Sequence, residues 1–401
     1  MKKLKPNASL LLVCLSLNSI TSMFVYTFLL AHIIDLSSNS IINIAIFYLV
    51  LHVSMIVLSL VLAPLFKKMN KALILKLGIG VKFVFVVLVA ILSDYIVNYV
   101  YIISICNALA EVVFWAGANA LIPKATDNQS MQQFFSFQSI IGGIISIVLP
   151  PIIGMWIDKF GMYIISVIMV FVVAAQYVTS IFIKDRGIEK STKIQYGKFV
   201  RSIKEKNIKT VKPIYLNMVL LGFCSNIGTL VLYFTYTVYN SNISLGIFST
   251  ITSILTIVFF AIFNIKKSVF KKNVSFIIYT VVVCISLLLI IFNLDKTTLI
   301  IFRFAWSIGN AVPSTVAGTQ RLEIVQNTGF EKYNVENMTL TEVFLDLGRV
   351  IGEITLLLMG VFSNGIFNTV VMCCYVVVII VHYVLTRYLV KKTEYIVPKT
   401  K

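Results

Sequence analysis

Four ionisable residues share one face of a predicted helix over 339–362: Glu342, Asp346, Arg349 and Glu353. Their spacing of four, three and four residues puts all of these side chains on the same side of the helix. The surrounding segment is otherwise mostly apolar. Because one charge at the centre of a bilayer costs about 2.5–3.5 kcal/mol on the insertion scale, such a stripe needs an explanation.

Two interpretations of this acidic stripe stay open. Arg349 can reach Asp346 three residues before it and Glu353 four residues after it, which would make the stripe a self-neutralising structural network. Alternatively, carboxylates in a poorly solvated place can carry protons or bind a cation. The first interpretation leaves Glu342 unpaired and the stripe at a formal charge of −2. Asp346, which faces Arg349, is expected to be the structural member.

A second polar face lies in the predicted helix over 97–122, where Asn107, Glu111, Trp115 and Asn119 follow one another at steps of four. Glu111 is near the middle and has no charged neighbour in its own helix. It is therefore either a carboxylate exposed to an internal cavity or a protonated group in an interhelical hydrogen bond.

Milder polar faces occur at helical spacing in three other segments. Such faces commonly serve helix packing, and substrate contact is the alternative. They are Asn18, Ser22 and Tyr26 in the first segment, Asn226, Thr229 and Tyr233 in the seventh, and Arg303, Trp306 and Asn310 in the tenth.

No motif for enzyme chemistry is present. The phosphate-binding pattern G-x-x-x-x-G-K-[ST] and the nucleophile elbow G-x-S-x-G do not occur. The six cysteines all fall inside apolar segments, which leaves neither a disulfide framework nor zinc-ligand spacing. The sequence predicts a protein that is not an enzyme and uses no cofactor and no metal.

The composition explains where these polar faces must lie. Hydrophobic residues make up 59% of the chain, charged residues 12%, and the mean hydropathy is +0.94. Soluble domains carry roughly 25% charged residues. The chain is therefore an all-α membrane protein. Its net charge of +18 does not indicate nucleic acid, because the basic residues lie in the short breaks between apolar segments.

Twelve segments are long enough to cross a bilayer, which takes about 20 residues. They cover residues 8–34, 41–65, 72–94, 97–122, 132–157, 162–183, 213–239, 244–263, 274–292, 297–317, 339–362 and 366–389. The long polar run 184–212 separates them into two sets of six. We expect two six-helix bundles, residues 1–183 and 213–401, joined by a linker.

The positive charges predict the orientation. The linker holds ten Lys and Arg against three acidic residues, and the breaks on the same side carry most of the rest. The opposite side has only Lys159 and Lys296. Basic loops stay in the cytoplasm, so the linker and both termini are predicted to be cytoplasmic in a multi-pass protein of a bacterial plasma membrane.

The loop between the second and third segments, APLFKKMNKALIL over 63–75, resembles the major facilitator signature G-x-L-x-D-R-x-G-R-K-x-x-L. The expected gate loop is Lys67, Lys68, Asn70 and Lys71. Asn70 stands where the family has the turn glycine, and Asn tolerates the left-handed conformation. Lys67 replaces the family's acid, which implies a gate that differs from the usual one or is weaker.

The segment 121–161, which begins with Leu121, Ile122 and Pro123, is similar to the family's efflux branch. Pro150 and Pro151 precede Gly154 as a remnant of the antiporter pattern G-P-x-x-G-G. The Arg that the family carries in its fourth helix is absent, with Asn107 nearest to its place.

The resemblance implies a fold and a function. In this family the first, fourth, seventh and tenth helices line a central cavity, which would bring Arg303 near Glu111 or an anionic substrate. We expect a monomeric antiporter, in contact with membrane lipid, that exports a small amphipathic or cationic compound in exchange for protons. An importer, a lipid or peptide exporter, and a non-transporting scaffold or sensor are the alternatives.

Overall fold

The computed structural model describes residues 4–38, 40–126, 128–185, 194–205, 211–265, 272–307, 333–362 and 365–394. Every regular element in these ranges is a helix. Each of the twelve segments predicted from the sequence contains helical residues. Seven of the described helices are long and apolar enough to cross a membrane. The prediction of an all-α membrane protein is therefore confirmed.

The described chain forms two compact units. The first contains Met1–Lys193 and Thr235–Ser253, and the second contains Ile194–Phe234 and Ile254–Lys401. The division of the chain at 184–212 remains a prediction from the sequence.

In the first unit, one continuous helical rod forms the first predicted segment. It consists of α1 (Pro6–Met23), a π-helical turn η1 (Phe24–Leu29) and α2 (Leu30–Leu36). Proline suits the first position of α1, where no intrahelical partner is needed for an N–H. A π turn widens the helix locally and shifts the side chains beyond it to a new face.

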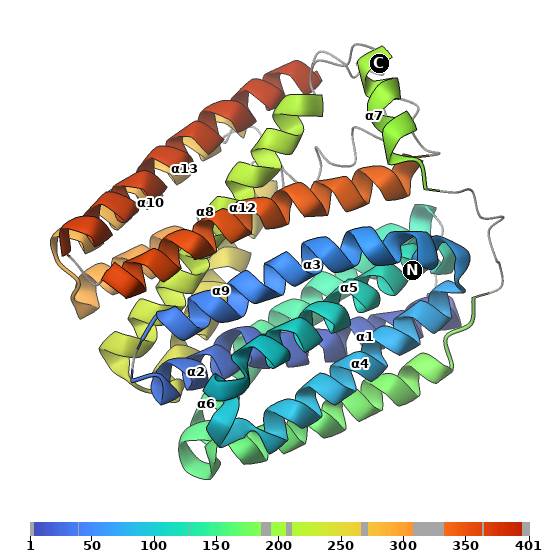
Figure 1. Cartoon of the computed structure of the whole chain (residues 1–401), viewed down its shortest axis with the longest axis horizontal. Helices are drawn as coiled ribbons and strands as arrows, with labels where there is room; N and C mark the ends of the chain where they lie inside the picture. Colours follow the sequence, from blue (N-terminus) through green and yellow to red (C-terminus); the bar gives the residue numbers. More distant parts are fainter. Residues whose placement is uncertain are drawn as a thin grey trace. The chain divides into compact units, whose positions relative to one another are not determined.

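Three long helices pack in this unit beside the rod: α3 (Ile42–Lys68), α4 (Lys71–Ile91) and α5 (Val100–Ala125), the last preceded by the short η2 (Ser93–Tyr99). The α4 and α5 backbones nearly touch (Figure 1). A Cβ on Gly78 would lie 2.6 Å from Phe114 Cα, and one on Gly117 would lie 2.7 Å from Leu75 Cα. Only glycine permits this approach, which holds the two helices in one register.

Residues 128–181 form α6 (Asn128–Ile181), which is two helices joined at Gly161. Gly161 has φ of 81° and ψ of 165°, a conformation that glycine adopts far more readily than other residues. This break separates the fifth and sixth predicted segments, and α6 packs on both α1 and α4.

The first turns of α9 (Asn242–Ile265) also belong to the first unit. Asp158 of α6 accepts hydrogen bonds from Asn242 Nδ2 at 2.8 Å and from Ile243 N at 3.2 Å. Asp158 thereby caps the start of α9, where backbone N–H groups have no intrahelical partner.

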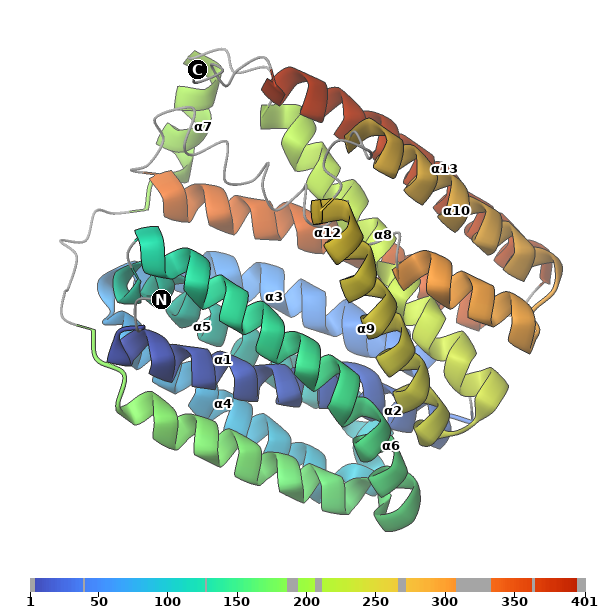
Figure 2. The ribbon, with the colours of Figure 1, turned by 180° about the vertical axis from the view of Figure 1, so that it is seen from behind.

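The second unit contains α7 (Tyr196–Glu205), most of α8 (Val211–Tyr239), the remainder of α9, α10 (Lys272–Phe292), α12 (Asn334–Phe362) and α13 (Gly365–Glu394). Helical residues 296–307 follow α10. Asp295 caps this stretch by accepting a bond from Thr298 N at 2.8 Å, and that bond holds the pKa of Asp295 below its ordinary value. Figure 2 shows α10 lying along α13.

Helices α8 and α12 of this unit also approach each other closely at glycines. A Cβ on Gly348 would overlap the carbonyl oxygen of Val219, and one on Gly222 would overlap that of Leu345. A Cβ on Gly352 would overlap the amide of Asn226. Gly222 and Gly348 therefore let the two backbones approach each other, and Gly352 leaves room for the Asn226 side chain against α12.

Candidate functional site

A buried ion pair lies at the centre of the first unit. Lys82 Nζ of α4 is 2.7 Å from Glu111 Oε1 of α5, and the two side chains are 1% and 8% exposed. Glu111 lies about 16 Å from the start of α5 at 1.5 Å per residue, close to mid-membrane depth. The glycine contacts at Gly78 and Gly117 set the helix spacing that brings the two charges together.

Neighbouring side chains complete the coordination of this pair. Lys82 Nζ also donates to Asn18 Oδ1 at 2.6 Å and lies 5.3 Å from the centre of the Phe114 ring. Trp115 Nε1 donates to the other carboxylate oxygen of Glu111 at 2.9 Å. The ammonium therefore has two oxygen acceptors and an aromatic face, and each carboxylate oxygen has a donor.

The polar face of the first helix continues beside the pair. Asn18 Nδ2 lies 3.4 Å from Ser22 Oγ, and Asn107 Nδ2 lies 3.4 Å from the Tyr26 hydroxyl. Asn107 is 1% exposed, and its Oδ1 has no hydrogen-bond partner among the described residues. Asn18 and Trp115 thus contact the ion pair directly, Ser22 extends it through Asn18, and Asn107 pairs with Tyr26.

Tyr26 lies in the π turn, and its ring is the first of an aromatic stack that continues onto α3. Its ring is parallel to that of Tyr48 in α3 at 6.4 Å, and Tyr48 is parallel to His52 at 5.7 Å. His52 is buried. The π turn aims Tyr26 towards both Asn107 and α3, and single π turns recur at functional positions in helices.

Lys82 is the site residue that sequence reasoning missed. It is one of few basic residues inside the predicted segments, and an intramembrane Lys predicts a partner. The sequence favours no pairing, because Lys82 and Glu111 lie 29 residues apart on different helices. Both carboxylate oxygens of Glu111 are engaged by Lys82 and Trp115, so Arg303 is not needed to neutralise it.

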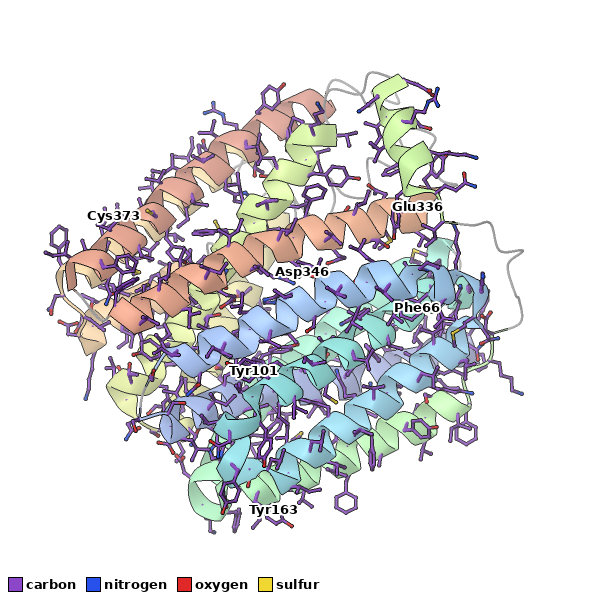
Figure 3. All side chains as sticks on the ribbon, viewed as in Figure 1. Phe66, Tyr101, Tyr163, Glu336, Asp346 and Cys373 are labelled. Carbon is purple, nitrogen blue, oxygen red and sulfur yellow. The ribbon has the colours of Figure 1, made fainter. Side chains whose placement is uncertain are left out.

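The acidic stripe of the second unit lies on α12, with Asp346 near the middle of the helix (Figure 3). Arg349 Nη1 is 2.8 Å from Asp346 Oδ1, which confirms the expected pair three residues apart. Asp346 is buried, whereas the Arg349 side chain is 27% exposed. Glu353 is 1% exposed, and Glu342 is half-buried.

Polar residues of α8 contact the same helix. Asn226 Nδ2 donates to the carbonyl oxygen of Arg349 at 3.1 Å, so Asn226 binds the backbone of the stripe rather than a charge. Thr229 is buried and Tyr233 is half-buried on the following turns. Arg303 and Trp306 are both buried in the helical residues 296–307. Asn310 lies outside the described residues.

The gate loop differs from expectation at Asn70. Its φ of −60° and ψ of 131° are extended rather than left-handed, so it does not replace a turn glycine. Instead Asn70 Oδ1 accepts from Leu73 N at 3.1 Å and caps α4. Asn is among the best N-cap residues, which accounts for its position here. Lys71 Nζ donates to the carbonyl oxygen of Phe66 at 2.6 Å, at the end of α3.

An acid does reach this loop, from the start of the linker. The Asp185 side chain is 2% exposed. Its Oδ2 accepts from Lys71 N at 3.0 Å, and its Oδ1 lies 3.5 Å from Lys124 Nζ at the end of α5. Asp185 therefore ties the ends of α4 and α5 together. At the end of α3, Lys67 is half-buried and Lys68 is exposed.

Comparisons with known proteins agree with this architecture. The family described as Major Facilitator Superfamily matches residues 11–353. No curated protein sequence matches the chain. Among solved structures, the chain is similar to the nucleoside transporter NupG, with a TM-score of 0.69, 12% identity, and coverage of 96% of this chain and 99% of that one. It is also similar to a bacterial homologue of the iron transporter ferroportin in the inward-facing state, with a TM-score of 0.68, 12% identity, and coverage of 97% and 99%. At these identities the likeness shows the fold alone.

Proposed function

The chain belongs to the major facilitator superfamily, and we propose that it exports a small amphipathic or cationic compound in exchange for protons across a bacterial plasma membrane. Its linker and termini would face the cytoplasm, as the positive charges predict. The observation that carries the proposal is the buried ion pair of Lys82 and Glu111 at mid-membrane depth.

The ion pair supplies a means of proton coupling. When Glu111 binds a proton, the charge that compensates Lys82 disappears. An uncompensated ammonium in a water-poor place is costly, so the protonated state favours a conformation in which Lys82 meets water or another anion. Loss of the proton restores the pair and favours the conformation described here. Protonation thus biases a two-state equilibrium, which coupled transport requires.

The acidic stripe supports a cationic substrate. On the face that it defines, α12 carries three carboxylates against the single guanidinium of Arg349. A cation brought near this face would be favoured electrostatically, whereas an anion would be repelled. The two similar structures, of a nucleoside transporter and an iron transporter homologue, do not select a substrate for this chain.

A non-transporting scaffold or sensor is the second candidate, because one observation favours it. Every oxygen of Glu111 has a donor, and Lys82 has its acceptors, so this cluster is well satisfied as it stands. A static network of this kind would hold a bundle together without any transport. Membership of a transporter family favours the first candidate.

Flux in proteoliposomes tests the proposal. The lipophilic cation tetraphenylphosphonium serves as the probe, with and without an imposed pH gradient. The wild-type protein should concentrate the probe against its gradient only when the pH gradient is present. Glu111→Gln removes the carboxylate, and the double variant Lys82→Met/Glu111→Leu removes it without leaving a buried charge. Both should lose the response to pH.

The matched control is Glu205→Gln, which removes an exposed linker carboxylate and should leave the response unchanged. If the double variant folds and still concentrates the probe under a pH gradient, the ion pair is not the coupling group. If the wild-type protein moves no compound from a panel of toxic cations, export of cations is refuted. The scaffold is then favoured.

A further inference from the structure

The short helix α7 in the linker has two opposite faces. Phe199 and Ile203 lie on one side, and Lys198, Arg201 and Lys204 lie on the other at steps of three residues. Phe199 is fully buried, whereas the three basic residues are exposed. An amphipathic helix with a basic outer face is typical of a helix that lies on a membrane surface.

The apolar face of α7 is docked within its own unit. The Phe199 ring lies 5.6 Å from that of Tyr333, immediately before α12, and Ile203 and Leu340 pack against the two rings. Gln195 N, just before α7, donates to Glu336 Oε1 at 3.0 Å. Figure 3 labels Glu336 at the start of α12, next to α7. These contacts fix α7 at the level where α12 enters the apolar part of the chain.

The basic face of α7 is left for another partner. Lys198 and Lys204 have no ion pair among the described residues. Arg201 has only the exposed contact with Glu205 at 2.8 Å, with side chains 79% and 61% exposed. Such an exposed pair adds little and does not remove the positive potential of the face. The sequence on either side of α7 adds Lys190, Lys193, Lys206 and Lys209 to the same linker.

We propose that α7 is a surface helix that binds anionic phospholipid headgroups of the cytoplasmic leaflet through Lys198, Arg201 and Lys204. The charge predicts the occupant, because the cytoplasmic leaflet carries a negative surface potential and attracts basic segments close to it. The docking site agrees with this occupant, because α7 packs at the start of α12, next to the predicted membrane segment 339–362. Binding would couple the lipid composition to the start of the helix that carries the acidic stripe.

The test places a spin label on Val200, which is 43% exposed between the two faces of α7. The native cysteines are first changed to alanine, and Val200→Cys is labelled. The protein is reconstituted in phosphatidylcholine vesicles and in vesicles with about 30% phosphatidylglycerol, an anionic lipid. Collision of the label with a water-soluble nickel chelate and with membrane-dissolved oxygen measures its position at the surface.

The label should be more shielded from nickel in the anionic vesicles, and about 0.5 M salt should reverse the difference. In the variant Lys198→Gln/Arg201→Gln/Lys204→Gln the surface-bound population should fall by about fivefold for each cation removed. This variant keeps Phe199, so α7 still docks on Tyr333. The matched control Lys159→Gln/Lys296→Gln removes exposed cations outside α7 and should behave as wild type.

Equal accessibility of the label in both kinds of vesicle overturns the proposal. So does shielding that persists in the triple variant, because α7 would then be held by its docking alone. Neither outcome depends on transport, so failure here is distinct from failure of the proposed exchange.

Discussion

Lys82 of α4 and Glu111 of α5 form an ion pair of 2.7 Å whose two side chains are almost fully removed from solvent. Asn18 and Trp115 occupy the remaining positions around it. A buried pair of this kind is weak evidence for stability by itself, since its desolvation offsets much of the attraction. Removing only one partner, however, leaves the other charge buried without compensation, which is strongly destabilising.

The first prediction concerns the removal of Lys82 alone. Lys82→Met leaves the Glu111 carboxylate without its cation and should lower the free energy of unfolding by about 3–5 kcal/mol. The double variant Lys82→Met/Glu111→Leu should recover most of that loss. Thermal unfolding in detergent measures both. The control is Lys76→Met on the same helix, because Lys76 is only half-buried. A Lys82→Met protein as stable as this control would mean that the ion pair does not contribute to the stability of the fold.

The second prediction concerns the linker acid Asp185. Asp185→Asn weakens its bonds to Lys71 N and Lys124 Nζ and should destabilise the start of α4 by about 0.5–2 kcal/mol, the range of a lost N-cap. Hydrogen exchange should become faster at the Lys71 amide. Glu205→Gln, which touches only an exposed pair, should leave this exchange rate alone. Unchanged exchange in Asp185→Asn would show that Asn70 alone holds the start of α4.

The third prediction uses the contact between α8 and α12. Gly348→Ala puts a methyl group where the carbonyl oxygen of Val219 lies, and the two helices have to separate. Overpacking of this kind costs about 1–3 kcal/mol. Gly142→Ala in α6 is the control, because nothing lies within 4 Å of its Cβ and alanine favours a helix. The variants should shift the unfolding temperature in opposite directions, and a shift in the same direction would refute the packing argument.

The fourth prediction concerns orientation. Single cysteines at Lys159 or Lys296 should react with an impermeant thiol reagent on intact cells, whereas a cysteine at Lys204 should react only after lysis. All three positions are exposed, so accessibility within the protein does not limit the reaction. Labelling of intact cells at Lys204 would reverse the topology and place the linker outside.

Sequence reasoning was most successful where a pattern is repeated along one helix. Hydropathy and length located the apolar helices, and the spacing of Asp346 and Arg349 predicted their pair. These features are local, because a helix fixes which residues share a face. The break at Gly161 was also predicted as a boundary, although its positive φ is visible only in the structure.

What the sequence could not supply is contact between helices. Lys82 meets Glu111 because Gly78 and Gly117 let two backbones approach, and no spacing within one helix encodes that. Asp185 reaches the gate loop from a segment more than a hundred residues away in the chain. Asn70 was assigned the wrong conformation, because Asn suits both a left-handed turn and a helix cap, and only the backbone angles distinguish them.

The three glycines between α8 and α12 also have a mechanical meaning. Each one receives a protruding backbone or side-chain group of the facing helix, so neither helix can turn about its axis or slide along the other without a collision. The two helices therefore behave as one rigid body. Asn226 and Arg349, which are joined across it, must travel together. Any rearrangement that alternates access has to occur at other helix contacts of the second unit. The acidic stripe on α12 then moves with α8 and α12 without being distorted.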